Sequence, residues 1–139
     1  MTTDYDFQSD LSANEVKAKS YVDVHMSPSP TPGTNDYTYD LSLANSFKLT
    51  LTQDSDIIFS NVPSSATETM IWTLTIQQIA SGAAKSVVYP TTVHWPGGLK
   101  PNLSATNGAI DQFVFMKTGS SSNIYGFTVG QDIKAPASP

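Results

Sequence analysis

The amino-acid sequence predicts an all-β protein: an antiparallel β-sandwich, jelly-roll-like, with about eight strands and an extended N-terminal arm. Short runs of alternating apolar and polar residues recur roughly every 8–12 residues from residue 37 onward, and turn residues separate them. No convincing helical periodicity lies between these runs. Charged residues make up only 14% of the 139 residues, and the abundant Ser and Thr are typical of β-rich surfaces.

Residues 1–36 are polar and form the predicted N-terminal arm. Pro28, Pro30 and Pro32 remove backbone donors and favour the extended polyproline II conformation, so the end of the arm is expected to be a semi-rigid spacer. Two local structures fit the region before it. Residues 12–15 have the spacing of a capping box that could begin a short helix through Ala18, whereas residues 19–24 could equally form an edge strand.

Residues 37–134 form the predicted β-sandwich body, and residues 135–139 follow as a C-terminal tail. The first strands are expected within residues 37–43, 47–51 and 57–59, and later ones at 86–89, 109–117 and 124–129. The longest strand is expected over residues 70–79. Its inward side is Met70, Trp72, Leu74 and Ile76, and its polar outward side is Thr73, Thr75 and Gln77.

The charge pattern excludes several classes of partner. The chain has twelve carboxylates, seven lysines and no arginine, with a formal net charge of -5, which argues against nucleic-acid or phosphate recognition.

Cysteine is absent, so disulfides and thiolate metal sites are excluded. The acidic first residues lack the pattern of a signal peptide, and no window is apolar enough for a membrane span. We therefore expect a soluble product made in a cytoplasm.

The sequence marks no catalytic residue, metal site or cofactor site, and the prediction is that the protein is not an enzyme. His25 and His94 are far apart in the chain and lack the further ligands of a zinc site. Asp54 and Asp56 could be imagined as paired carboxylates for glycoside hydrolysis or as calcium ligands, but their turn context favours capping of backbone N–H groups. A Ser-His-Asp triad is not marked by any nucleophile motif.

Asp111 interrupts an apolar strand and is expected to be a buried acid that accepts hydrogen bonds from backbone donors and orders the Trp95 loop. A set of aromatic residues invites two interpretations. Tyr89, Trp95, Tyr125 and Phe127 could form a platform on which sugars stack, or they could pack in the core. Core packing is favoured, because aromatic residues are usually buried and Trp95 directly precedes a rigid corner.

Two motifs mark the fold: Trp95-Pro96-Gly97-Gly98 and, later, Tyr125-Gly126-Phe127. Together with other segments in the same order, they resemble a domain of tailed-phage virion proteins, including fibre ends and small capsid-surface proteins. The resemblance spans about residues 40–134. Its further segments are Phe47-Lys48-Leu49-Thr50-Leu51, Ile57-Ile58-Phe59-Ser60-Asn61-Val62-Pro63, Val93-His94, Asp111-Gln112-Phe113-Val114-Phe115 and Gly130-Gln131-Asp132.

The resemblance implies a β-sandwich that assembles as a homotrimer and carries no catalytic activity. A short chain with a Pro-rich arm is expected to be a head decoration (cement) protein of the virion, bound to the major capsid protein at the capsid surface. The arm would add its backbone to a neighbouring sheet edge. The expected arm contacts are Tyr5, Phe7, Leu11, Tyr21, Val22, Pro28, Pro30 and Pro32. The alternative is a short fibre or appendage that binds a host-surface glycan through loop 118–123 and the aromatic set around Trp95.

Overall fold

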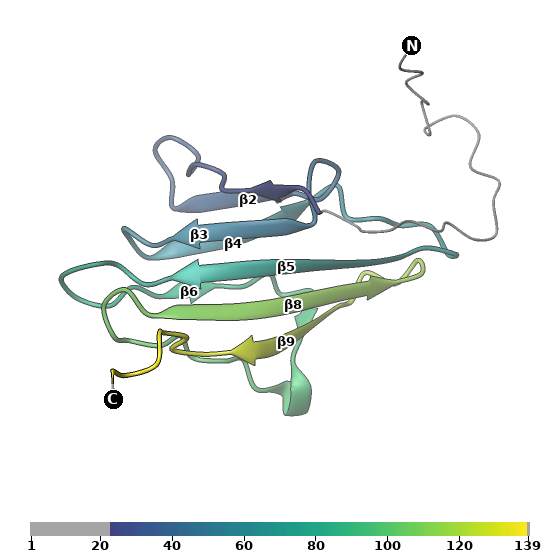
Figure 1. The fold of residues 1–139 in the computed structure, drawn as a ribbon. Coiled ribbons are helices and arrows are strands. Elements are labelled where there is room, and N and C mark those ends of the chain that lie inside the picture. Colours follow the sequence, from purple (N-terminus) through teal and green to yellow (C-terminus); the bar gives the residue numbers. More distant parts are fainter. Residues whose placement is uncertain (1–22, 139) are drawn as a thin grey trace, which may run out of the picture.

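The structure is a computed structural model that describes residues 23–138. These residues form nine β-strands and one 3-10 turn, and they contain no α-helix (Figure 1). The strands are β1 (His25–Met26), β2 (Asp36–Asp40), β3 (Ser46–Thr50), β4 (Ser55–Ser60), β5 (Thr69–Gln77), β6 (Val87–Val88), β7 (Val93–His94), β8 (Ile110–Thr118) and β9 (Ile124–Gly130). The 3-10 turn η1 (Pro96–Gly98) follows β7. The predicted all-β class is thus confirmed, and the long strands lie within a residue or two of their expected positions.

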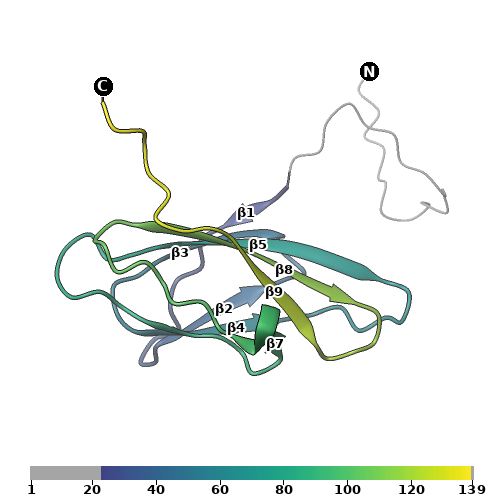
Figure 2. The same ribbon diagram turned by 90° about the horizontal axis from the view of Figure 1, so that it is seen from below.

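The strands form two sheets that lie face to face. The larger sheet has the order β1-β3-β5-β8-β9-β7, and the smaller has the order β2-β4-β6. Figure 2 shows β2 and β4 beneath β3, β5 and β8. Rings from the two sheets meet between the layers: Phe59 of the small sheet contacts Trp72 and Phe115 of the large sheet, with centroid distances of 5.2 and 5.0 Å. This two-layered arrangement gives the protein one continuous core.

The structure corrects the predicted antiparallel pairing. Only β5–β8 and β8–β9 are antiparallel, whereas the other five pairings are parallel. The reason is that the chain alternates between the sheets from β1 to β7. β1 therefore pairs with β3, β2 with β4, β3 with β5 and β4 with β6, and the two strands of each pair run in the same direction. A parallel pair needs a crossover of roughly a dozen residues or more. In these four pairs a strand of the opposite sheet provides it, whereas β8 of the same sheet lies between β7 and β9, the fifth parallel pair. A jelly roll, which is built from antiparallel strands, is not confirmed.

The core follows the predicted alternation along β5. Trp72, Leu74 and Ile76 are buried and Met70 is half-buried, whereas Thr73 is exposed. Aromatic side chains dominate the interior, because flat rings from facing strands fill a wide space between two sheets. The largest fully buried side chains are Trp72, Tyr39, Phe47, Phe113 and Phe115.

The described end of the predicted arm is attached to the body. β1 lies at one edge of the large sheet, where His25 pairs with Ser46 and Met26 with Phe47. Pro28 is half-buried, and Pro30 and Pro32 are exposed in the connection to β2. The predicted helix at 12–18 and the arm contacts Tyr5, Phe7, Leu11, Tyr21 and Val22 lie outside the described residues. Residues 135–138 are exposed, as is usual for a tail.

Candidate functional site

The Trp95 corner turns the chain sharply after β7. Trp95 is extended, and Pro96 opens the single 3-10 turn, where its missing N–H costs nothing. Gly97 and Gly98 have φ values of 66° and 71°, in the left-handed region that glycine adopts without strain. The Gly98 N–H donates to the Trp95 carbonyl at 2.9 Å and the Leu99 N–H to the Pro96 carbonyl at 3.3 Å. The sequence of the corner is therefore explained by its backbone.

The second motif supplies the surface on which the Trp95 ring rests. A Cβ placed on Gly126 would lie 2.8 Å from Cζ3 of Trp95 and 2.9 Å from Cγ1 of Val93, closer than real Cβ contacts. The indole also contacts aromatic rings of the core. Its centroid lies 4.9 Å from that of Tyr89 and 5.8 Å from that of Phe115. The corner and the Tyr125-Gly126-Phe127 segment thus form one packing unit.

Asp111 is a buried acid that holds two distant segments together. Its carboxylate accepts the Ser104 N–H and hydroxyl, both at 2.7 Å, and the Asp132 N–H at 2.9 Å. Three donors satisfy a carboxylate that is only 2% exposed, which offsets the cost of removing it from water. Ser104 follows the Trp95 corner in the chain, and Asp132 follows β9. Asp111 therefore orders the chain after the corner and not residues 95–98 themselves.

A second buried polar residue, Gln78, was missed by sequence reasoning. Its amide nitrogen donates to the carbonyls of Lys85 and Ser104, at 3.0 and 3.2 Å, and its oxygen accepts the N–H groups of Ile79 and Lys85. Gln78 continues the inward positions 72, 74 and 76 of β5, so strand parity contained the signal. Ser104 is therefore fixed from two sides, by Gln78 and by Asp111.

The structure places the aromatic residues Tyr89, Trp95, Tyr125 and Phe127 on two different sides of the large sheet. Tyr89 is buried and Trp95 half-buried, and both contact Phe113 of the core. Tyr125 and Phe127 are 41% and 43% exposed on the other side of the large sheet. Because successive strand residues point to opposite faces, the four rings cannot form one platform.

Tyr125 and Phe127 belong to a larger surface, which we call the outer apolar face. It consists of Ile71, Val114, Met116, Tyr125, Phe127 and Val129, on β5, β8 and β9. Strand register brings these residues side by side: Ile71 pairs with Met116, which pairs with Tyr125, and Val114 pairs with Phe127. None of the six carries a formal charge. Contiguous exposed apolar surface of this kind marks a contact site more often than isolated apolar residues do.

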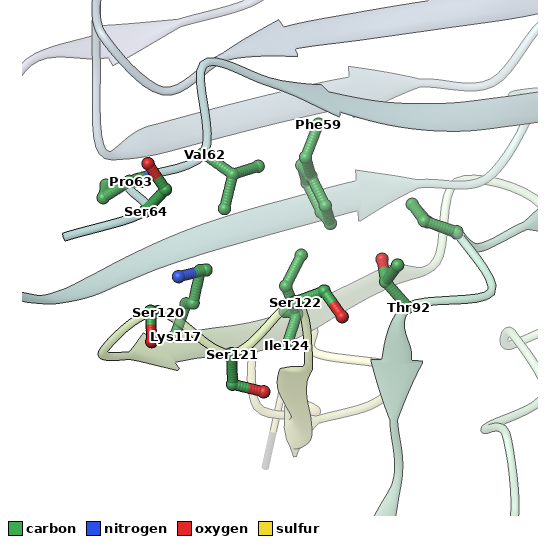
Figure 3. Close-up of a pocket in the computed structure, with 11 residues that line it drawn as sticks. Phe59, Val62, Pro63, Ser64, Thr92, Lys117, Ser120, Ser121, Ser122 and Ile124 are labelled. Atoms are coloured by element: carbon green, nitrogen blue, oxygen red, sulfur yellow. The ribbon is translucent and has the colours of Figure 1, made fainter. Parts of the chain in front are cut away.

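A pocket of about 360 Å³ opens at one end of the two layers (Figure 3). Lys117 and the loop with Ser120 and Ser121 lie on one side of it, and Val62, Pro63 and Ser64 on the other. Lys117 is only 5% exposed, and its amine donates to the Gly119 carbonyl at 2.5 Å. No role for Lys117 was predicted from the sequence, although Lys117 alternates with the same inward period as Phe113 and Phe115 in β8.

The acids and histidines do not gather into a chemical centre in the described part of the chain. Within residues 23–138, no three His, Asp or Glu side chains lie close enough together to hold a metal ion. The His25 ring nitrogen Nδ1 and the Ser46 hydroxyl share a hydrogen bond of 2.9 Å, and His94 lies beside Tyr125. Asp54 accepts the N–H and hydroxyl of Ser86, at 2.8 and 3.0 Å, and these bonds lower the pKa of its carboxyl.

No protein-family model matches this chain, and neither do curated proteins or solved structures. Among residues 23–138, no helix is long and apolar enough to cross a membrane. Three features of the molecule bear on its function: the Trp95 corner, the outer apolar face and the pocket beside Lys117.

Proposed function

We propose that this chain is a non-enzymatic structural protein of a tailed-phage virion, a homotrimeric head decoration (cement) protein that binds and stabilises the capsid surface. The resemblance of the motifs at 95–98 and 125–127 to virion proteins supports the virion assignment. The observation that carries the proposal of self-assembly is the outer apolar face, which offers side chains from three neighbouring strands of the large sheet.

The lack of charge on this face makes it the surface on which a second copy can pack. The chain carries a net charge of -5, so two copies repel each other wherever their carboxylates meet. Around a three-fold axis the same face of three copies converges, and any charge there would oppose its own kind. The outer apolar face is uncharged, and its exposed Tyr125 and Phe127 are the residue types enriched in the cores of protein interfaces.

The capsid contact is assigned to the arm. β1 joins the edge of the large sheet by parallel pairing with β3, so the described end of the arm is fixed at this edge. The three arms of one trimer would bind the particle simultaneously. Such multivalent attachment offsets a modest affinity of each arm. The partner in this proposal is the major capsid protein.

Two measurements test the proposal. Light scattering of the purified protein is expected to give a mass three times 14.9 kDa. Quantitative mass spectrometry of purified particles is expected to find many copies per particle. A monomeric mass at all concentrations rejects the trimer, and a handful of copies per particle rejects the decoration role.

A second candidate function is a short fibre or appendage module that binds a host-surface glycan. The pocket beside Lys117 favours it, since loop 118–123 contributes three adjacent serines to a cavity with apolar walls. Trp95 is not a suitable residue for testing glycan binding, because its ring packs on Gly126 and its loss would disturb the corner. Glycan-array binding that disappears when the serines of this loop are replaced would support the second function, and absence of binding to every host polysaccharide would exclude it.

A further inference from the structure

The pocket at the end of the two layers contains an unusually buried lysine. Lys117 is the last inward-facing residue of β8, opposite Met70 of β5, and it is 5% exposed. Lysine side chains usually keep their ammonium group in water and are almost never fully buried unless paired. The position of Lys117 therefore calls for a partner.

Within residues 23–138 that partner is a single carbonyl group. The Lys117 amine donates to the Gly119 carbonyl, and none of the described carboxylates bonds it. An ammonium group has three N–H donors, so two remain for other acceptors. A buried cation without a counter-charge is costly, and a carboxylate in the pocket would provide both the charge and charge-assisted hydrogen bonds.

The walls of the pocket fit a sugar ring. Phe59, Val62 and Pro63 form an apolar side on which the C–H face of a pyranose can pack, and Ser64, Thr92 and residues 120–122 place hydroxyl groups around it. The volume of about 360 Å³ lies at the lower end of the range of roughly 300–1,000 Å³ found for small-molecule sites. It therefore accommodates a single ligand unit rather than a long chain.

A peptide carboxylate fits the same pocket less well. Bound peptides usually pair their N–H and C=O groups with a backbone edge. Here two of the lining residues, Pro63 and Pro90, have no N–H to donate, and the polar groups are mainly side-chain hydroxyls and the Lys117 amine. Hydroxyls that both donate and accept match the hydroxyls of a sugar better than a peptide backbone.

We propose that this pocket, the Lys117 pocket, binds a monosaccharide unit that carries a carboxylate, such as a uronic or sialic acid. Lys117 pairs with the carboxylate, the serines of loop 118–123 bind ring hydroxyls, and Phe59 and Pro63 contact the apolar face of the ring. This inference rests on the second candidate function, glycan binding, and is independent of trimer assembly. It names the class of glycan that this function would recognise.

The test is an NMR titration of the full-length protein with glucuronic acid and with N-acetylneuraminic acid, against glucose as the neutral comparison. At least one acidic sugar is expected to shift the amide signals of residues 59–62, 64 and 117–124. Glucose is expected to bind at least about tenfold more weakly, because it cannot form the charge-assisted bond to Lys117. N-acetylglutamate serves as the peptide-type carboxylate. If it binds as tightly as the acidic sugars, the assignment to a sugar is overturned.

Lys117→Met keeps most of the packed stem and removes the charge, and it is expected to weaken binding of the acidic sugar about tenfold or more. Lys134→Met is the matched control, because Lys134 is an exposed lysine paired with Asp132. If Lys117→Met fails to fold, Ser120→Ala/Ser122→Ala replaces it, with an expected loss of about fivefold from missing hydroxyl bonds. Unchanged affinity in the variant that folds, or equal binding of glucose and both acidic sugars, overturns the inference. Equal binding of glucose and both acidic sugars would still support glycan binding as the function.

Discussion

The indole ring of Trp95 rests on the bare α-carbon of Gly126. The two residues lie on segments that are neighbours in the large sheet, since β7 pairs with β9 through Val93–Ile124 and His94–Tyr125. A Cβ at position 126 would come within 2.9 Å of both Cζ3 and Cη2 of the ring. The Trp-Pro-Gly-Gly and Tyr-Gly-Phe motifs therefore depend on each other: the first provides a ring and the second the space for it.

Gly126→Ala is expected to destabilise the fold by about 1–3 kcal/mol, because the added methyl overlaps Trp95 and Val93. Urea unfolding followed by fluorescence measures the change. Gly130→Ala, in the same strand, is the control, since its Cβ would meet only the end of the flexible Ile133 side chain, at 3.1 Å. Equal unfolding midpoints for the two variants would contradict the packing role of Gly126.

Asp111→Asn is expected to lower stability by about 1–3 kcal/mol. The Ser104 and Asp132 N–H groups each bond a different carboxylate oxygen of Asp111, whereas the amide of Asn has only one acceptor oxygen. The amide nitrogen would face either the Ser104 or the Asp132 N–H. Hydrogen exchange is a sharper readout than global unfolding, because the amides of residues 104 and 132 should lose protection first. Unchanged protection at both positions would show that the carboxylate does not hold these segments.

Acid is expected to weaken the fold through Asp54 and Asp40. The Ser86 N–H bond lowers the pKa of Asp54, and the Ser42 hydroxyl bond lowers that of Asp40. A folded-state pKa below the unfolded value means that the stabilisation is present above the unfolded pKa of about 4 and is lost as pH falls through the folded pKa. Carboxyl NMR titration should show that Ser86→Ala moves the pKa of Asp54 upward. A pKa unaffected by this change would disprove the hydroxyl contribution.

Sequence patterns located the strands well and their pairing poorly, for one physical reason. Alternation reports which side chains face the core, so Trp72, Leu74 and Ile76 could be placed correctly. It is blind to the direction of the neighbouring strand. The step from β2 to β3 and back to β4 crosses between the sheets, yet it leaves the same alternating pattern as a hairpin within one sheet.

The polar residues of the interior show a similar limit. Asp111 stood out because it interrupts an apolar run, whereas Gln78 and Lys117 lie at strand ends, where polar residues are ordinary. The Lys117 pocket could not be predicted, because its walls come from segments far apart in the chain, such as 62–64 and 120–122. The alternation of inward and outward residues along β5 and β8 could have indicated that the side chains of Gln78 and Lys117 point inward.

Deletion of residues 1–22 is expected to leave the body folded and to abolish the proposed attachment to the particle. The truncation keeps β1, whose pairing with β3 completes the edge of the large sheet. Circular dichroism and sedimentation of particles incubated with the truncated protein measure fold and attachment separately. Full occupancy of particles by the folded truncated protein would exclude the arm as the capsid contact.

Phe127→Asp is expected to convert the proposed trimer to a monomer, because it places a negative charge where three copies of the outer apolar face of an acidic protein would converge. Leu99→Asp is the matched control: Leu99 is 78% exposed in the loop after η1, outside this face, so the same charge should leave the trimer intact. Light scattering over a range of concentrations separates the two. Salt adds a second test, since screening of the new charges should partly restore the Phe127→Asp trimer. A trimer that persists in Phe127→Asp at low salt would move the self-contact away from the outer apolar face.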